Sequence, residues 1–284
     1  MASLKAEHPE LSLSSLLEAS GLARSTFFYH QARLALPDPD AELKDAIRSA
    51  FSQAHGRYGH RRIHAVLMRR GWAVAKKTVL KLMRALGLFC KVRRRRPHLS
   101  WKGQVGNVAP NHLNREFSAD APNQKWVTDI TEFAVGNQKV YLSPILDLFD
   151  RSIVAHAMAT SPSLALTLRP LRKALQVVPT SKDLLVHSDQ GVQYQSRAWQ
   201  TALASVGAKQ SMSRKGNCYD NSVMENFFGQ LKTEMFHGTT FTSPAELTKP
   251  INDYIHWYNT ERISTTRKGL SPVQYRAQTL TPRI

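Results

Sequence analysis

Three acidic residues lie in or beside apolar segments of this 284-residue chain, although its net charge is +18. Asp129 lies within VTDITEF, Asp189 within HSDQGVQY and Glu225 within DNSVMENF. Carboxylates gathered in a partly buried site would repel one another and lose hydration. Divalent cations offset both costs, and an oxygen-rich site suits Mg²⁺ or Mn²⁺. Two such ions about 3.5–4 Å apart are the usual arrangement for phosphodiester chemistry.

The segments around these acids predict a mixed α/β domain in the order β-β-β-α-β-α-β-α. Three runs of β-branched and aromatic residues, joined by short turns, predict an antiparallel meander at 125–135, 139–149 and 152–159. Two further strands alternate with three helices. The fold class we expect is α/β, a mixed five-stranded sheet with flanking helices, preceded by all-α units.

This order places the three acids. Asp129 is expected in the middle of the first strand, and Asp189 just past the carboxyl end of the fourth, which reads as buried on both faces. Glu225 is expected one turn into a later helix, which Asp220 or Asn221 would cap. If the first and fourth strands are neighbours, the carboxylates can converge at one end of the sheet.

Each acid taken alone has an ordinary structural interpretation. Asp129 could mark an edge or a bulge, and Asp189 could bond its own backbone in a turn. Glu225 could simply favour a helix N-terminus. Other acids near strand or helix ends are explained by turns and caps, namely Glu132, Asp147, Asp150 and Asp220. His187 and Gln190 flank Asp189 and are candidates to support a metal ligand.

The positive charge is concentrated in the N-terminal part of the chain. Residues 1–118 hold 21 Lys and Arg against 8 Asp and Glu, and no acidic residue occurs between Asp45 and Glu116. A field of one sign over a folded segment points to a polyanionic partner, and we expect nucleic acid. A membrane surface is disfavoured because the basic stretches lack a broad apolar face.

The same region divides into helical units. Residues 1–36 predict a helix-turn-helix unit, and 41–90 a second, helix-turn-helix-like one. Residues 91–120 predict a basic linker, 121–240 the catalytic core and 241–284 its C-terminal helical segment. The candidate DNA-contacting residues of the second unit and linker are Arg57, Arg61, Arg62, Lys76, Lys77, Lys81, Arg93, Arg94, Arg95 and Arg96.

No run of eighteen apolar residues occurs, and the N-terminus lacks the pattern of a signal peptide. Cys90 and Cys218 form no CxxC pair, so a disulfide framework is not expected. These features predict a cytoplasmic protein.

The acidic blocks resemble those of retroviral-integrase-like transposases, specifically the OrfB product of the IS-three family of bacterial insertion sequences. That family carries a DDE triad with 35 residues between the second Asp and the Glu, the spacing found here between Asp189 and Glu225. It also places a basic residue seven positions after the Glu, here Lys232. The segments at 55–72 and 258–275 resemble further family blocks, although Ser264 stands where many relatives carry His.

The resemblance implies a ribonuclease H-like integrase core with Asp129, Asp189 and Glu225 as catalytic metal ligands for two Mg²⁺ ions, which Mn²⁺ could replace. It implies cleavage at the ends of an insertion sequence and strand transfer by a 3′-hydroxyl, with Lys232 near the DNA. The expected partners are the terminal inverted repeats, target DNA, a second copy in at least a dimer on DNA, and the upstream-frame OrfA product.

Two other classes of function fit part of the pattern. One is a ribonuclease H-like nuclease that cuts without strand transfer. The other is a DNA-binding regulator of the full-length transposase. Joined DNA products would exclude the first, and metal-dependent cleavage that is lost in Glu225→Gln would exclude the second.

Overall fold

The computed structural model describes residues 11–34, 36–90, 108–176, 183–214 and 218–281. Near the N-terminus, α2 (Leu13–Ser20) and α3 (Arg24–Leu34) flank the expected turn. Ser12 caps α2 by accepting a hydrogen bond from the Ser15 amide, and Gly21 ends the helix with a φ of 64°. Residues 93–96, the arginine run, lie outside the described residues.

A second helical unit contains α4 (Ala41–Gln53), α5 (His60–Arg69) and α6 (Lys76–Ala85). Apolar residues recur at helical spacing, and these are the ones buried between the helices. They include Ile47 and Ala50 of α4, Ile63 and Leu67 of α5, and Val79, Leu82 and Met83 of α6. These residues form one face of each helix, which is the face that packs inside the unit.

The sheet follows, with all the strands that the sequence predicted and one additional break. Its strands are β1 (Lys125–Thr128), β2 (Thr131–Val135), β3 (Gln138–Asp147), β4 (Ile153–Ala159), β5 (Leu185–Ser188) and β6 (Lys209–Met212). The first expected strand is divided into β1 and β2, so the sheet has six named strands rather than five. Both pieces pair antiparallel with β3, and β4 pairs with β3 as well, whereas β5 is parallel to both β1 and β6.

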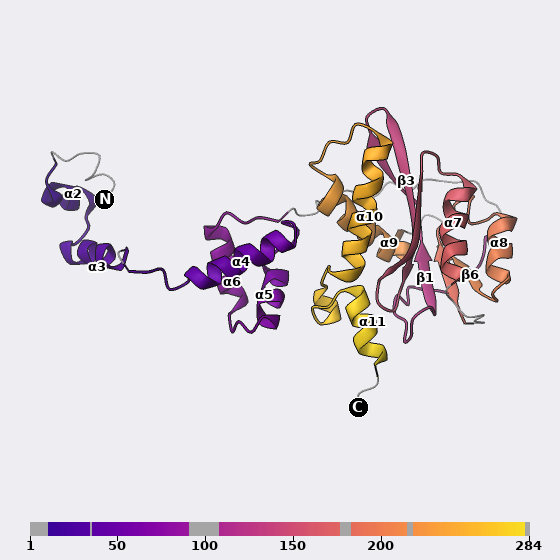
Figure 1. The fold of residues 1–284 in the computed structure, drawn as a ribbon, viewed down its shortest axis with the longest axis horizontal. Helices are drawn as coiled ribbons and strands as arrows, with labels where there is room; N and C mark the ends of the chain where they lie inside the picture. Colours follow the sequence, from indigo (N-terminus) through magenta and orange to yellow (C-terminus); the bar gives the residue numbers. More distant parts are fainter. Residues whose placement is uncertain (1–10, 35, 91–107, 177–182, 215–217, 282–284) are drawn as a thin grey trace.

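Helices cover both faces of the sheet (Figure 1). On one face lie α7 (Leu164–Leu175) and α8 (Arg197–Ala204); on the other lie α9 (Ser222–Leu231), the π-helix η2 (Lys232–Phe236) and α10 (Pro244–Thr260), followed by α11 (Pro272–Leu280). Successive strand residues face opposite sides. Trp126 accordingly joins the apolar cluster beneath α7 and α8, while Val127 joins the cluster beneath α9 and α10.

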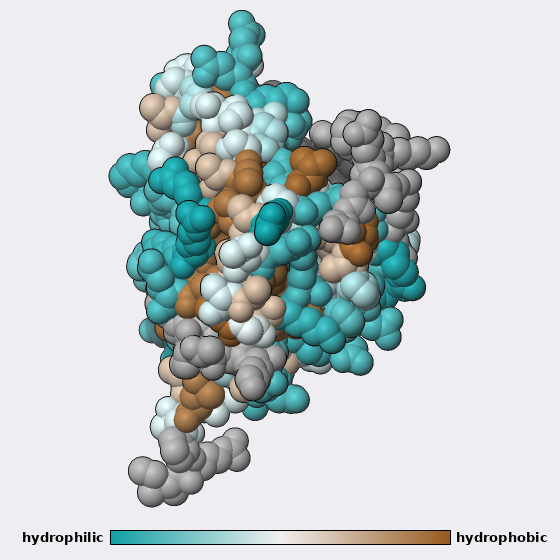
Figure 2. Space-filling view, turned by 90° about the vertical axis from the view of Figure 1, so that its right-hand side faces the viewer, coloured by the Kyte–Doolittle hydropathy of each residue, from teal (hydrophilic) through white to brown (hydrophobic). Residues whose placement is uncertain are grey.

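The α7 and α8 side of the molecule is shown as a surface in Figure 2. Hydrophilic residues dominate it, and the hydrophobic ones form small patches between them. None of the helices within the described ranges is long and apolar enough to cross a membrane.

The α4–α6 unit packs against the α10 side of the core, because its buried residues belong to the same apolar cluster as those of α9 and α10. Tyr58 reaches across this interface, where its hydroxyl donates to the Glu261 carbonyl at 3.2 Å and accepts from the Ile263 amide at 2.8 Å. Arg69 donates to the Gly269 carbonyl at 3.0 Å. The helical unit and the sheet domain thus share one core.

Candidate active site

Asp129 and Asp189 follow two neighbouring parallel strands. In the ladder between β1 and β5, Lys125 pairs with Leu185, and each pair lies sixty positions apart in sequence, as do Asp129 and Asp189. Both acids therefore emerge at equivalent positions past the carboxyl ends of their strands. The first and fourth expected strands are thus neighbours, an arrangement that the sequence allowed.

Asp129 does not lie in the middle of a strand, as the sequence had predicted. It lies in the break between β1 and β2, and its Oδ1 accepts a hydrogen bond from the Ile130 amide at 2.7 Å. That bond removes a backbone donor from the ladder, which is how Asp side chains compete with regular structure. The break directs the Asp129 carboxylate to the end of the sheet.

Asp189 lies in the turn after β5, as expected. Its Oδ1 accepts from the Gly191 amide at 3.0 Å. A Cβ at Gly191 would lie 3.0 Å from that same oxygen, so a side chain here would press on the Asp189 carboxylate. The turn is also tied to β6, because the Gln190 amide group donates to the Ser213 carbonyl at 3.0 Å and the Ser213 N–H donates to the Ser188 carbonyl at 2.9 Å.

Glu225 lies in the first turn of α9, the helix that follows a short 3₁₀ segment, η1 (Cys218–Asn221). Asn221 occupies the cap position, but its side chain makes no capping bond. Its Nδ2 instead donates to the Thr128 carbonyl at 3.2 Å, and its buried Oδ1 has no partner among the described residues. Asn221 therefore fastens the start of the Glu225 helix to the residue before Asp129.

The electrostatics show that these carboxylates share one environment. Burial raises the pKa of Asp129 well above its usual range, and the negative charges of Asp189 and Glu225 raise it further. The Asp189 side chain is exposed at the surface, yet the protein packed behind it raises its pKa too, against the opposing effect of the Gly191 N–H. This environment therefore favours the protonated forms of Asp129 and Asp189 more than water does.

Tyr194 lies beneath the two aspartates and is almost wholly buried. Burial raises the pKa of its hydroxyl well above 10, and Asp129 and Asp189 add to the increase. Its ring packs edge to face with Trp199 at a centroid distance of 4.9 Å. Tyr194 thus belongs to the apolar cluster beside the two acids and is near enough for their charges to act on it.

His187 does not contact the acids, although it precedes Asp189 by two positions. Its Nδ1 lies 2.8 Å from the Ser211 hydroxyl and its Nε2 lies 3.0 Å from the Ser213 hydroxyl, in a fully buried setting. Burial lowers its pKa to about 4, so the ring is neutral near pH 7. His187 joins β5 to β6.

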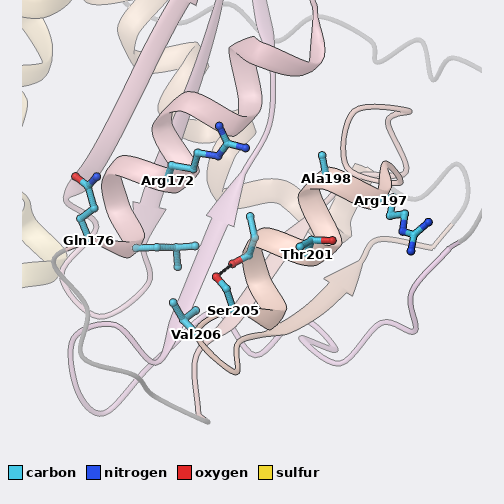
Figure 3. Close-up of a pocket in the computed structure, with 9 residues that line it drawn as sticks. Arg172, Gln176, Arg197, Ala198, Thr201, Ser205 and Val206 are labelled. Carbon is cyan, nitrogen blue, oxygen red and sulfur yellow. Dashed lines mark hydrogen bonds between the residues drawn. The ribbon is translucent and has the colours of Figure 1, made fainter.

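The three acids do not line the pocket that lies between α7 and α8. A shallow pocket between α7 and α8 is lined by residues that include Arg172, Gln176, Arg197 and Thr201, and none of the three acids lines it (Figure 3). Within the described ranges, no three His, Cys, Asp or Glu side chains converge closely enough to form a preassembled ion site.

Comparison with known proteins assigns this arrangement to a family. Residues 119–218 and 225–280 each match the family described as Integrase core domain, and residues 38–96 match HTH-like domain. The chain is 43% identical to the putative transposase InsK for insertion sequence element IS150 of Escherichia coli K12, over 96% of both chains.

The chain belongs to the transposases of bacterial insertion sequences. It is also 32% identical to the transposase InsF for insertion sequence IS3A of the same organism, over 95% of this chain and 96% of that one. A probable transposase for IS1353 from Shigella flexneri is 39% identical over 93% of this chain but only 52% of its own length. Among solved structures, the HTLV-2 integrase catalytic core in complex with magnesium is similar at a TM-score of 0.43, with 18% identity over 55% of this chain and 98% of that one.

In this transposase, Lys232 follows the last residue of α9 and lies against the core. Its Nζ is 5.3 Å from the centre of the Phe133 ring of β2, and burial lowers its pKa. The side chain is half-buried.

The basic residues of the second helical unit divide into two groups. Arg61 and the α6 lysines Lys76, Lys77 and Lys81 are exposed, as a DNA-contacting role requires. Arg57 and Arg62 are only partly exposed and also contact the core. The Arg57 guanidinium lies 4.5 Å from the Trp257 ring centre, and Arg62 pairs with Glu234 at 3.4 Å. Both guanidinium groups belong to the interface with the core.

Glu234, in η2, is the anion at the centre of that interface. Arg262 donates to it through Nε and Nη2 at 2.8 and 2.6 Å, and the Tyr254 hydroxyl donates at 2.8 Å. The Arg262 side chain is 2% exposed and that of Glu234 is 8% exposed. The sequence did not reveal this cluster, because Arg62 and Glu234, which pair in it, lie 172 positions apart.

Three acids set aside as turn or cap residues are fully buried ion-pair partners. Asp147 and Asp150 both bind Arg276 of α11, and Asp220 binds Arg214 and Arg115. Only a contact between distant segments explains such burial.

Proposed function

We propose that this transposase uses Asp129, Asp189 and Glu225 as the catalytic carboxylates for cleaving DNA strands at the ends of its insertion sequence and transferring them. The supporting observation is the equivalent position of Asp129 and Asp189 on adjacent parallel strands, with the Glu225 helix fastened beside them by Asn221. Burial raises the pKa of both aspartates, a cost that a bound cation would offset.

The three residues fit a divalent cation by their chemistry. All their donors are carboxylate oxygens, which suit Mg²⁺ and Mn²⁺. We infer that the side chains, not preassembled in the structure, draw together as the cations bind, because the positive charge removes their mutual repulsion. Two bound Mg²⁺ ions, or Mn²⁺ in their place, would supply Lewis-acid stabilisation and a lowered pKa for the attacking oxygen.

Two chemically similar steps follow from this site. In the first, a water oxygen bonds to phosphorus, the bond from phosphorus to the 3′ oxygen breaks, and a 3′-hydroxyl is released. In the second, that hydroxyl loses its proton and bonds to another phosphorus, whose leaving oxygen departs in line. No side chain becomes bonded to DNA, so no covalent intermediate between protein and DNA is expected.

The exposed lysines of α6 and Arg61 are proposed to bind the terminal inverted repeats, while the core receives target DNA. Lys232, which follows α9 seven positions after Glu225, is proposed to contact a phosphate near the site. Arg93, Arg94, Arg95 and Arg96 are proposed to follow the DNA backbone.

Joining two ends requires at least two copies on DNA, so we propose a dimer or larger assembly. The match covers only 52% of the length of the IS1353 relative. This additional length in a relative supports cooperation between this chain and a further protein, such as an OrfA product. We place the reaction in the bacterial cytoplasm, where the DNA is.

The deciding experiment uses labelled oligonucleotides that carry the insertion-sequence ends. Asp129→Asn, Asp189→Asn and Glu225→Gln should each lose cleavage and strand transfer in Mg²⁺ or Mn²⁺ while keeping the circular dichroism of the wild type. Glu132→Gln, which changes an exposed acid on β2, is the matched control and should remain active. Activity in any one of the three variants would overturn the proposed site.

The products separate the remaining alternatives. Joined strands support transposition, whereas cut strands with no joined product identify a nuclease. DNA binding with neither product, in the presence of the upstream protein, identifies a regulator.

A further inference from the structure

Arg115, Arg214 and Tyr219 form what we call the Arg–Tyr rim, a group of cationic and aromatic side chains around a single buried acid. Arg214 donates to Asp220 through Nε and Nη2, both at 2.9 Å, and Arg115 donates through Nε at 2.9 Å. The Arg115 guanidinium also lies 5.7 Å from the centre of the Tyr219 ring. Asp220 thereby holds both guanidinium groups in fixed positions.

The rim carries more positive charge than its buried acid can neutralise. Asp220 is fully buried, whereas the Arg115 and Arg214 side chains are 45% and 54% exposed. Hydrogen bonds from Arg214 hold the pKa of Asp220 well below its usual range, so its charge persists at any ordinary pH. Two cations against one anion leave a surplus positive charge that faces solvent.

The rim adjoins both strand ends that carry the proposed catalytic aspartates. Arg214 directly follows Ser213, whose amide donates to Ser188, the residue before Asp189. Tyr219 and Asp220 directly precede Asn221, whose side chain donates to Thr128, the residue before Asp129. A DNA strand at the carboxylates therefore passes this rim.

The segment that supplies Arg115 is held in a strained conformation. Asn114 and Arg115 have φ values of 44° and 62°, in the left-handed region that residues other than glycine seldom adopt. The segment is fixed on both sides, because Asn111 donates to Asp220 at 3.0 Å and the His112 and Leu113 amides donate to the Ser211 hydroxyl. The surrounding contacts thus maintain an unfavourable backbone that presents Arg115 beside Tyr219.

All three side chains of the rim are accessible to a ligand. Arg115 and Arg214 are 45% and 54% exposed, and Tyr219 is 69% exposed beside them. Guanidinium groups bind phosphate oxygens, and an exposed aromatic ring stacks on an unpaired base. The two chemistries occur together where proteins hold single-stranded nucleic acid.

We propose that the Arg–Tyr rim binds unpaired nucleotides of the DNA strand beside the reacting phosphodiester. Arg115 and Arg214 contact backbone phosphates, and the Tyr219 ring stacks on a base. The rim thereby favours frayed or single-stranded DNA ends over fully paired ends. This inference rests on the proposed function, because it assumes that DNA reaches the carboxylates.

The test measures binding apart from catalysis. The full chain carrying Glu225→Gln is titrated, in EDTA, with a fluorescent duplex that ends in four unpaired nucleotides and with the matching blunt duplex. The parent should prefer the frayed duplex, and Tyr219→Ala should bind it about tenfold more weakly, within the range expected when one base loses its aromatic stacking partner. Tyr219→Phe should bind like the parent, because the ring remains.

Arg115→Ala and Arg214→Ala should each reduce the dependence of affinity on salt by the amount expected for about one phosphate. Lys249→Ala, which removes an exposed cation paired with Asp253 on α10, is the matched control and should leave both the preference and the salt dependence unchanged. 2-Aminopurine at the unpaired position should be quenched by the parent and by Tyr219→Phe but not by Tyr219→Ala.

Equal binding of both duplexes by the parent, or unchanged binding in Tyr219→Ala, would overturn the rim as a binding site. A loss in Tyr219→Phe equal to that in Tyr219→Ala would overturn stacking. The proposed function fails in a different assay, if Asp129→Asn still cleaves DNA. The binding assay and the cleavage assay therefore distinguish failure of the rim from failure of the proposed function.

Discussion

Asp129 and Asp189 are matched across the β1–β5 ladder, each one residue past the end of its strand. Parallel strands put both carboxylates at the same edge of the sheet, and Glu225 of α9 lies near enough for its charge to raise the pKa of Asp129. The arrangement concentrates negative charge in a partly buried place, which lowers the stability of the fold.

Asp129→Asn should therefore stabilise the protein while abolishing catalysis. Because the pKa of Asp129 is raised on folding, the folded state is penalised once the pH exceeds the value for the unfolded chain. At pH 7 we expect a gain of at least about 1 kcal/mol, or roughly 2–4 °C in melting temperature. Thermal unfolding in EDTA measures it, and a lower melting temperature would contradict the electrostatic interpretation.

The same thermal unfolding measurement is repeated with Mn²⁺ in place of EDTA. Wild-type protein should gain about 2.7 kcal/mol when the ion is present at a hundred times its dissociation constant. Asp129→Asn should gain much less, and an equal gain in both proteins would place the ion elsewhere.

His187 should make the stability fall in mild acid. Its pKa is lowered to about 4 on folding, so the unfolded chain binds a proton below pH 6.5 that the folded chain does not. The contribution of neutral His187 to the free energy of unfolding is constant above pH 6.5. It is lost progressively toward pH 4, to a total of about 3 kcal/mol. Urea unfolding at pH 7 and pH 5 should show a smaller pH dependence in His187→Gln, whereas His256→Gln, at an exposed position on α10, should resemble the wild type.

Gly191→Ala should impair the site more than the fold. The added Cβ would come within 3.0 Å of Asp189 Oδ1, so the carboxylate must move or lose its bond from the Gly191 amide. We expect a tenfold or greater loss of cleavage with a stability change below about 1 kcal/mol. The readout is cleavage rate against Mn²⁺ concentration, with Val192→Ala at the exposed next residue as control. Wild-type kinetics in Gly191→Ala would contradict this account of the turn.

Glu234→Gln should loosen the α4–α6 unit from the core. The substitution leaves the buried Arg262 guanidinium without its counter-charge, a loss expected to cost about 3 kcal/mol. Melting should fall by roughly 6–12 °C, and limited proteolysis should cut more readily between the unit and the sheet. Glu132→Gln breaks only the exposed pair with Lys139 and should change stability by less than about 1 kcal/mol. Equal losses of stability in the two variants would contradict a structural role for Glu234 that is larger than that of an exposed ion pair.

The two groups of basic residues should respond in different assays. Replacing Lys76, Lys77 and Lys81 with Ala should weaken binding to the insertion-sequence ends and lower the salt slope by about one for each phosphate that the variant no longer binds. Arg57→Ala should instead reduce stability by about 1–2 kcal/mol, since its guanidinium lies on the Trp257 ring. If Arg57→Ala changed the salt dependence of DNA binding, Arg57 would be one of the residues that contact DNA.

The sequence predicted the positions of Asp189 and Glu225 because local signals define them, a short apolar strand before a turn and a helix with its apolar stripe. It placed Asp129 wrongly because VTDITEF reads as one β run. The break depends on a side-chain bond to the Ile130 amide, which no propensity reveals.

The interface residues were beyond prediction for a different reason. Arg57 and Arg62 look like free cations in sequence, and their partners Trp257 and Glu234 lie far along the chain. Asp220 likewise reads as a helix cap, but Arg115 reaches it from 105 positions away. Burial of a charge by distant segments has no local pattern.

The attachment of the α4–α6 unit through Glu234 has a geometric consequence. A duplex gripped by α6 is held at a constant offset from the acids, so the unit works as a ruler. One base pair inserted between the gripped sequence and the cut would rotate the scissile phosphate by about a tenth of a helical turn. Cutting should then stay at the original distance from the gripped sequence and should not follow the displaced phosphate, even when the spacer grows by a whole turn of the double helix.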